Sequence, residues 1–187
     1  MLVDVMSKFT KNRQEALAVL GDYWLEHVKG SPNIYIAWYD DRTRQVRRRT
    51  TRTDVLQEAE IELARFVAVN SEMRQEDTGA VFLSHILIRY YEQHAKHLPS
   101  QGDAIRSIRL WLKHFGDIPI FDITADDQDA FQRFLAEEKR YAVATANRVI
   151  SVGRAALRRA YKRGEIKTQP FIFDIDAKKY GRNRRRT

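Results

Sequence analysis

The segment TANRVISVGRAALRRAYKRG, residues 145–164, holds six basic side chains and no acidic one. Plotted as a helix, the basic residues fill one sector. The opposite sector is apolar and contains Val149, Ile150, Gly153, Ala156, Leu157, Ala160 and Tyr161. Exposed helix faces usually mix charges, because opposite charges four residues apart attract and like charges repel. We therefore expect a helix, capped by Thr145 and ended at Gly164, whose solvent face binds a polyanion.

The positive charge of the whole chain is concentrated in three segments. The net charge is +8 over 187 residues. Residues 42–52, 145–164 and 177–187 each contain six Lys or Arg and no acid, whereas the rest of the chain contains 15 basic and 25 acidic residues. An otherwise acidic protein with confined basic patches is typical of nucleic-acid binding through defined surfaces.

Composition excludes several other classes of protein. The chain has no cysteine, which rules out disulfides and thiol chemistry and suits a reducing cytosol. No apolar run reaches the roughly 20 residues that a membrane span needs. The opening MLVDVMSKF is too short and too polar for a secretory signal. We therefore expect a cytoplasmic protein that makes no membrane contact.

Residue patterns typical of catalysis are missing. Of the five histidines, only His94 and His97 have a helical ligand spacing, and no third ligand is near them in the sequence. The acidic cluster Asp126, Asp127 and Asp129 falls in the first turn of a predicted helix, where it complements the helix dipole. Neither a glycine-rich phosphate loop nor a nucleophile elbow is present. The sequence therefore predicts no catalytic residue, no metal site and no cofactor.

The N-terminal part is predicted to hold a helix and then a hairpin. Residues 9–28 have helical apolar spacing, and KGSPN ends the pattern; the stripe comprises Leu17, Leu20, Trp24 and Val28. The β-rich runs 34–39 and 45–51 flank a polar turn and predict a hairpin. A second helix follows, capped by Thr53, with an apolar side made of Leu56, Ala59, Leu63, Phe66 and Val67.

The side chains of the predicted hairpin are expected to point alternately to its two faces. Arg47 and Arg49 are expected on one face of the hairpin and Arg48 on the other, because successive side chains point to opposite sides of a strand. Trp38 and Tyr39 likewise point in opposite directions, and one of them is expected in the core.

The remainder of the chain is predicted to be helical. The polar segment 71–80 is aperiodic and is expected to be a linker. Helices are predicted over 81–98, 103–116 and 124–140, before the basic helix described above. In the second of these, Arg106, Arg109 and Lys113 lie opposite an apolar side. The predicted division is a helix in 1–32, a hairpin–helix unit in 33–70, the linker 71–80, a helical domain in 81–176 and a basic tail in 177–187.

This order of parts resembles a known family. Residues 81–170 resemble the SAM-like core-binding domain of tyrosine recombinases, the phage integrases. The matching features are LKHFGDIPIFDIT, an acidic helix start, TANRVISVGRAALRRAYKRGEI and Pro170. Residues 33–70 look like the small arm-binding unit that precedes that domain in many integrases. The resemblance implies a mainly α fold, with a small α+β N-terminal unit and then a four-helix SAM-like bundle.

The resemblance also implies a division of function. In that family the core-binding domain clamps one side of the recombination site, and a following domain carries catalytic arginines, a His-x-x-Arg element and a tyrosine nucleophile. No histidine of this chain is followed three residues later by arginine, and the chain ends near the expected interdomain linker. We therefore expect the non-catalytic, DNA-binding half of a recombinase from a phage or mobile element, with double-stranded DNA as its partner and with room for self-association on DNA.

The expected DNA contacts follow from the basic faces and the resemblance. They are Arg47, Arg48, Arg49, Arg106, Arg109, Lys113, Thr145, Asn147, Arg148, Ser151, Arg154, Arg158, Arg159 and Lys162. A merely solvated basic face is the plain alternative. Two other functions stay open, namely a stand-alone regulator that occupies recombination sites without cutting and an RNA-binding protein, because a basic helix and a hairpin do not select their polymer.

Overall fold

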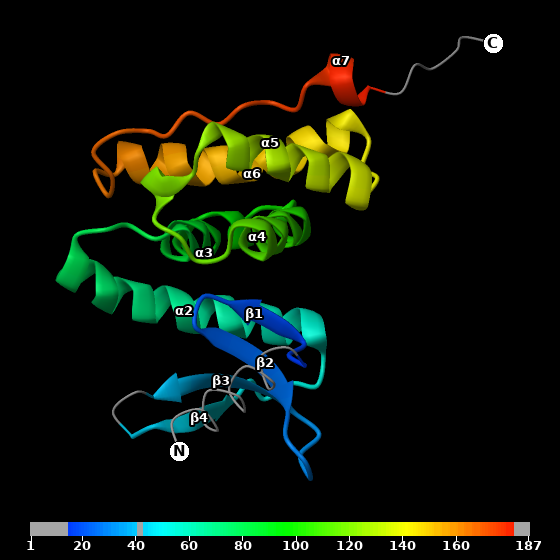
Figure 1. Cartoon of the computed structure of the whole chain (residues 1–187). Helices are drawn as coiled ribbons and strands as arrows, with labels where there is room; N and C mark the ends of the chain where they lie inside the picture. Colours follow the sequence, from blue (N-terminus) through cyan, green and yellow to red (C-terminus); the bar gives the residue numbers. More distant parts are fainter. Residues whose placement is uncertain (1–14, 41–42, 182–187) are drawn as a thin grey trace.

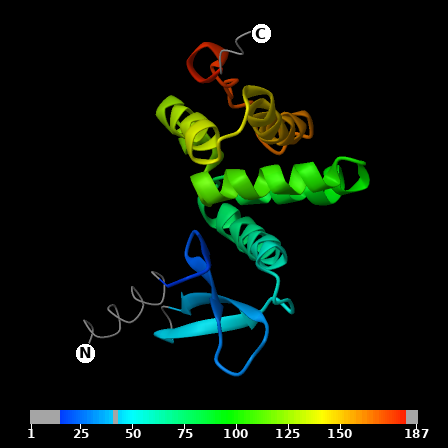
Figure 2. The ribbon, with the colours of Figure 1, turned by 90° about the vertical axis from the view of Figure 1, so that its right-hand side faces the viewer.

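The elements are stacked in successive layers (Figure 1). The computed structural model describes residues 15–40 and 43–181, with the helical backbone alone for residues 71–78. A four-stranded sheet lies at one end, followed by helix α2, by the pair α3 and α4, and by the pair α5 and α6. Helices of neighbouring layers cross at steep angles (Figure 2). The predicted class, an α+β N-terminal unit followed by a helical bundle, is confirmed.

The sheet is antiparallel, with strand order β1-β2-β3-β4. Its strands are β1 (Ala18–Leu20), β2 (Tyr23–His27), β3 (Ile34–Asp40) and β4 (Gln45–Thr50). The predicted hairpin is therefore present as β3 and β4. Trp38 opposite Arg47 and Ile36 opposite Arg49 lie on the face that packs on α2. Trp38, rather than Tyr39, is the aromatic residue of the predicted pair that packs on the core.

The predicted helix 9–28 is wrong over its described part, which forms β1 and β2. Leu20 pairs with Tyr23, so Gly21 and Asp22 make a two-residue hairpin turn, and Gly21 has a left-handed φ of 59°. This conformation favours glycine, and a Gly-Asp pair is a hairpin signal. Strand β2 is buried on both faces at Trp24 and Leu25, which hides the alternation that would have marked it as a strand. Residues 9–14 lie outside the described residues.

Helix α2 (Leu56–Thr78) connects the sheet to the bundle. The Thr53 hydroxyl accepts a hydrogen bond from the Val55 amide and donates one to Glu58, as expected of a residue at a helix start. The predicted linker 71–80 is wrong, because the helical backbone continues to Thr78. The buried residues of α2 and α3 share one core, so the units at 33–70 and 81–176 are packed on each other.

The bundle contains the four helices that were expected. They are α3 (Leu83–Gln93), α4 (Gln101–Phe115), α5 (Ala125–Arg133) and α6 (Val143–Lys162), with the short turns η1 (Ala95–His97) and η2 (Ile120–Asp122), the π-helical turn η3 (Phe134–Glu138) and the final α7 (Ala177–Tyr180). Thr124 caps α5 as predicted: its hydroxyl accepts from the Asp127 amide, and the Asp127 carboxylate accepts from the Thr124 amide.

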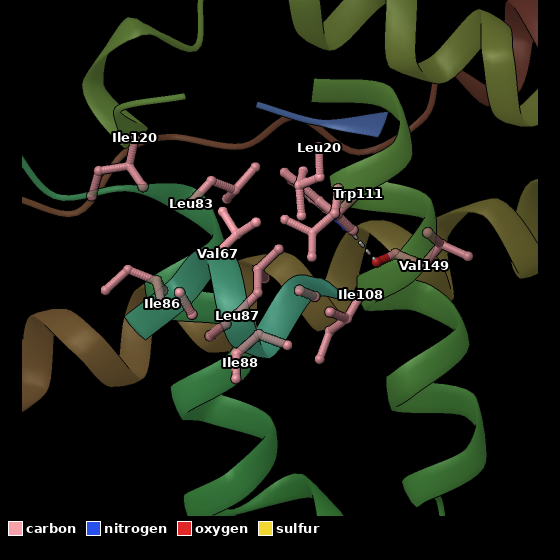
Figure 3. Packing of buried hydrophobic residues seen from close by; sticks show 14 of the residues in the cluster. Leu20, Val67, Leu83, Ile86, Leu87, Ile88, Ile108, Trp111, Ile120 and Val149 are labelled. Atoms are coloured by element: carbon pink, nitrogen blue, oxygen red, sulfur yellow. Dashed lines mark hydrogen bonds between the residues drawn. The ribbon is translucent and has the colours of Figure 1, made fainter. Parts of the chain in front are cut away.

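A close contact joins α4 to α6 (Figure 3). Trp111 of α4 is fully buried, and its indole N–H donates to the Val149 carbonyl of α6 at 3.0 Å. A Cβ placed on Gly153 would lie 2.3 Å from the Trp111 ring. Glycine therefore allows the two helices to cross at this distance, and the crossing sets which side of α6 faces solvent.

His114 lies where α4 meets α5, among aromatic rings. Its ring centroid is 5.0 Å from that of Phe131 and 5.2 Å from that of Phe134. Burial lowers the pKa of His114, although a backbone hydrogen bond at Asp127 and the negative charges of Glu138 and Asp127 act in the opposite direction. The folded state therefore favours the neutral imidazole.

Replacement of Gly153 by alanine tests the α4–α6 crossing. We expect G153A to lower the free energy of unfolding by about 2–3 kcal/mol, because the added methyl group overlaps the Trp111 ring. G102A is the matched control: Gly102 lies in α4 with nothing within 4 Å of its added Cβ, so this change should be neutral or stabilise by up to about 1 kcal/mol. Urea denaturation measures both. Equal effects would contradict the close crossing.

The His114 environment predicts a pH dependence. Because the folded-state pKa lies below the ordinary value of about 6.5, stability is complete above that value and decreases as the pH falls through it. We expect the parent chain to lose more unfolding free energy between pH 7.5 and 5.5 than H114Q, measured by denaturation at each pH. An equal loss in the two proteins would contradict this environment.

Candidate nucleic-acid interface

One stripe of α6 points to solvent along the whole helix. Arg148, Ser151, Arg158 and Lys162 are exposed, and Ala155 between them is partly exposed. These positions recur every three or four residues, which keeps them on one side of the helix. The residues predicted on the core side of α6 are buried except for Tyr161, which is 47% exposed. We call the set Arg148, Ser151, Ala155, Arg158 and Lys162 the α6 stripe.

The exposed face of α4 adds basic residues at one end of the stripe. Arg106 has a side chain 70% exposed and bonds Asp103 at 2.5 Å, while Arg148 of α6 lies 3.9 Å from the same carboxylate with its side chain 74% exposed. Asp103 therefore brings Arg106 and Arg148 together. Lys113 of α4 is also exposed. Arg106 and Arg148 thus form one surface to which two helices contribute.

Arg109 is not part of this exposed surface. Its guanidinium forms an ion pair with Glu60 of α2, and both side chains are only about one quarter exposed. This pair connects α2 to α4. The prediction that Arg109 contacts DNA missed this role, because Glu60 is 49 residues away in the sequence.

Two further predicted contacts of α6 hold the C-terminal segment instead. We call residues 171–176 the strap; it runs across α5 and α6 (Figure 1). The Arg154 guanidinium donates to the Asp174 carboxylate at 2.7 Å and to the Ile172 carbonyl at 3.0 Å. The Asn147 side-chain oxygen accepts from the Ile175 amide at 2.9 Å. These polar groups of Arg154 and Asn147 are therefore occupied within the protein.

The strap is also attached to α5 through two glutamines. Gln128 exchanges hydrogen bonds with the backbone of Phe171 and Phe173, and Gln132 does the same with Asp174 and Asp176. Ile172 and Ile175 of the strap are buried. The strap has no regular secondary structure, and it is nevertheless packed on the bundle. Sequence inspection missed Gln128, Gln132 and Asp174, and the only available signal was two glutamines four residues apart on a helix.

The start of α6 differs from the prediction, whereas its end is as predicted, because Gly164 follows the last turn with a left-handed φ of 72°. The helix begins at Val143, after Ala142, so Thr145 lies inside its first turn and does not cap it. Arg159 is only partly exposed, and its Nε atom is buried without a hydrogen bond. Burial raises the pKa of the neighbouring Tyr90, and the Arg159 charge acts in the opposite direction. Arg159 therefore faces α3 more than solvent.

The hairpin arginines each have a neighbour within the sheet unit. Arg47 pairs with Asp40 at 3.2 Å and Arg48 with Glu26 at 2.5 Å. Arg49 lies over the Phe66 ring at 5.4 Å from its centroid. All three remain exposed, so their charges stay accessible at the end of the molecule opposite α6.

Comparison with protein families identifies the helical part. Residues 86–179 match the model of the phage integrase SAM-like domain, which is about half of the chain. The chain belongs to this family. The SAM-like domain so defined begins in α3 and includes α4, α5, α6 and the strap. The resemblance drawn from the sequence is confirmed.

Comparison with individual proteins adds one structural likeness. The solved structure described as a lambda integrase tetramer bound to a Holliday junction aligns with a TM-score of 0.42 and 21% sequence identity. The alignment covers 78% of this chain and 44% of the integrase chain, so the present chain spans less than half the length of that protein. No curated protein matches.

The described residues contain neither a metal site nor a membrane-spanning helix. Among them, no three His, Asp or Glu side chains gather in a way that could hold a metal ion. No helix in the described part is long and apolar enough to cross a membrane.

Hydrogen exchange tests the attachment of the strap to the SAM-like domain. N147A removes the acceptor of the Ile175 amide, and we expect the protection of that amide to fall about tenfold, as for loss of a hydrogen bond worth about 1.4 kcal/mol. S151A, on the exposed side of the same helix, is the control and should leave the protection of Ile175 unchanged. Protection of Ile175 that is equal in N147A and the parent would contradict this contact.

Proposed function

We propose that this chain binds double-stranded DNA as the non-catalytic part of a site-specific recombinase of the phage integrase family. The observation that carries the proposal is the α6 stripe, which is long, exposed and free of acidic residues. Side chains spaced in this way along one helix suit the phosphates and base edges of a groove. Membership of the SAM-like family supports the choice of DNA over RNA.

The contacts differ in the roles that we propose for them. Arg148, Arg158 and Lys162 are the primary contacts, with Ser151 beside them and with Arg106 and Lys113 on α4. Arg154 and Asn147 position the strap, and Arg109 positions α2. Thr145, within the first turn of α6, is a phosphate contact at the end of the stripe. Arg159 is a peripheral contact, since it is only partly exposed.

We further propose a division of labour between the two basic surfaces. The sheet unit, with Arg47, Arg48 and Arg49, would address one DNA element and the SAM-like domain another. The two surfaces lie at opposite ends of the layered molecule. The strand-exchange chemistry would then belong to a separate domain, and the protein would work in the cytoplasm on the DNA of a phage or mobile element.

A charge-matched pair of variants tests the proposed interface. We expect R158Q/K162Q to weaken binding to duplex DNA about tenfold or more and to reduce the slope of log K against log salt by about 1.8, since each phosphate contact releases about 0.9 counterions. The control is R133Q/R140Q, which removes two exposed charges outside the stripe. Fluorescence anisotropy over a salt series measures both.

The outcomes separate the proposal from its rivals. Equal binding by the two double variants would show that the stripe is not the contact surface. Tighter binding to a matched RNA duplex would favour the RNA-binding alternative. A covalent adduct with a suicide DNA substrate, seen on a denaturing gel, would overturn the non-catalytic assignment.

A further inference from the structure

A cavity of about 580 Å³ lies between the end of β4 and helix α2. Its lining residues belong to β3, β4, the turn after β4 and α2. Of these elements, the sheet lies at the end of the molecule opposite α6 (Figure 1). Arg49 and Arg52 line it from the strand side and Arg65 from the helix, while Glu62 is its one acidic lining residue. The lining is therefore strongly basic.

The three arginines are held in different ways. Arg65 is bound on both sides, by Glu62 and by Glu92 of α3 at 2.8 Å, so its charge is compensated. Arg49 makes no ion pair within the described part of the chain, and its guanidinium lies over the Phe66 ring, which orients the group without neutralising it. Arg52 is exposed and likewise has no acidic partner among the described residues. Two uncompensated guanidinium groups thus border one cavity.

The backbone places Arg52 at the cavity through a defined turn. Arg52 has a φ of 63°, in the left-handed region that a residue with a Cβ rarely adopts. Hydrogen bonds of the neighbouring threonines hold this turn: the Arg52 amide donates to the Thr50 hydroxyl, and the buried Thr51 hydroxyl donates to the Ile34 carbonyl. The position of Arg52 is therefore determined by the chain on either side and not by any contact of its own side chain.

The remaining polar groups of the lining favour an anion. The Thr50 hydroxyl already accepts one hydrogen bond and keeps its proton for donation. The Phe66 ring and Val69 supply an apolar wall on the helix side. Planar guanidinium groups bind phosphate oxygens in pairs, and an exposed site with two of them matches a phosphate better than a single carboxylate.

We propose that this cavity binds a phosphate group of a nucleic-acid backbone, with Arg49 and Arg52 as its ligands and Thr50 as a neutral donor. The inference rests on the proposed DNA binding and adds to it a contact on the helix-facing side of the sheet. Arg52 and the cavity were absent from the contacts expected from sequence. A free phosphate compound offers the same chemistry, so the test separates the two sources.

The experiment uses the full chain and a closely matched control. R52Q removes a proposed ligand of the cavity. R44Q is the control: Arg44 is also exposed and also has a left-handed backbone, but it does not line the cavity. In amide NMR spectra, inorganic pyrophosphate should shift Thr50–Arg52 and Asn70 in the parent and in R44Q, but not in R52Q. R52Q should also bind long duplex DNA several-fold more weakly than R44Q, with a salt slope smaller by about 0.9.

Each outcome decides the inference. DNA binding by R52Q that equals binding by R44Q, while R158Q/K162Q is impaired, would overturn the cavity contact and leave the proposed function intact. Pyrophosphate shifts without any effect of R52Q on DNA would overturn the nucleic-acid assignment in favour of a free phosphate compound. Weaker DNA binding by R52Q when R158Q/K162Q binds normally would support the cavity and reject the α6 stripe. R49Q gives a second reading, with its near-ultraviolet circular dichroism reporting whether the Phe66 cluster stays folded.

Discussion

The contact between Trp111 and Gly153 determines how the rest of the SAM-like domain is arranged. The indole ring of Trp111 fills the space in which a side chain at position 153 would lie. Its N–H donates to the carbonyl of Val149, which lies one turn before Gly153 in α6. Because Gly153 is pressed against α4, α6 cannot rotate about its own axis without a clash. Its apolar side is thereby turned inward, and the basic stripe is turned to solvent.

The packing of the elements also decides which basic side chains have an acidic partner within the protein. Acidic side chains at the junctions between elements pair with particular arginines: Glu60 with Arg109, Asp174 with Arg154, and Glu26 with Arg48. The Glu60–Arg109 pair is about three-quarters buried, so removal of one partner would leave the other charge partly desolvated. The Glu60–Arg109 pair joins α2 to α4 and the Asp174–Arg154 pair joins the strap to α6, whereas the Glu26–Arg48 pair lies within the sheet. Within the described part of the chain, Arg158 and Lys162 of the α6 stripe and Arg49 and Arg52 at the cavity have no acidic partner, and these cations are available to an external anion.

Helix α2 makes the sheet and the bundle a single packed body. Its buried side chains belong to the same core as those of α3 and of the sheet, and the Arg65–Glu92 and Glu60–Arg109 pairs connect it to the bundle. Burial raises the pKa of Glu92, but hydrogen bonds from Lys96 and Arg65 outweigh that effect and lower it overall. The carboxylate therefore stays charged at this junction. A helix, instead of an aperiodic linker, lies between the sheet and the bundle (Figure 1).

Sequence patterns alone determined the features that depend on local periodicity and charge. The four bundle helices, the Thr124 cap, the β3–β4 hairpin and the inward faces of α4 and α6 all follow from residues a few positions apart. The family was also readable, since its motifs are contiguous. Tertiary structure decided the rest: strands β1 and β2 instead of a helix, α2 in place of a linker, and the use of Arg109, Arg154 and Asn147 as internal ties. For Arg109 and Arg154 the deciding partners, Glu60 and Asp174, lie far along the chain, and periodicity holds no information about such partners. A basic residue can be assigned to a helix face from its spacing, but whether it meets solvent or a distant carboxylate depends on how the layers pack.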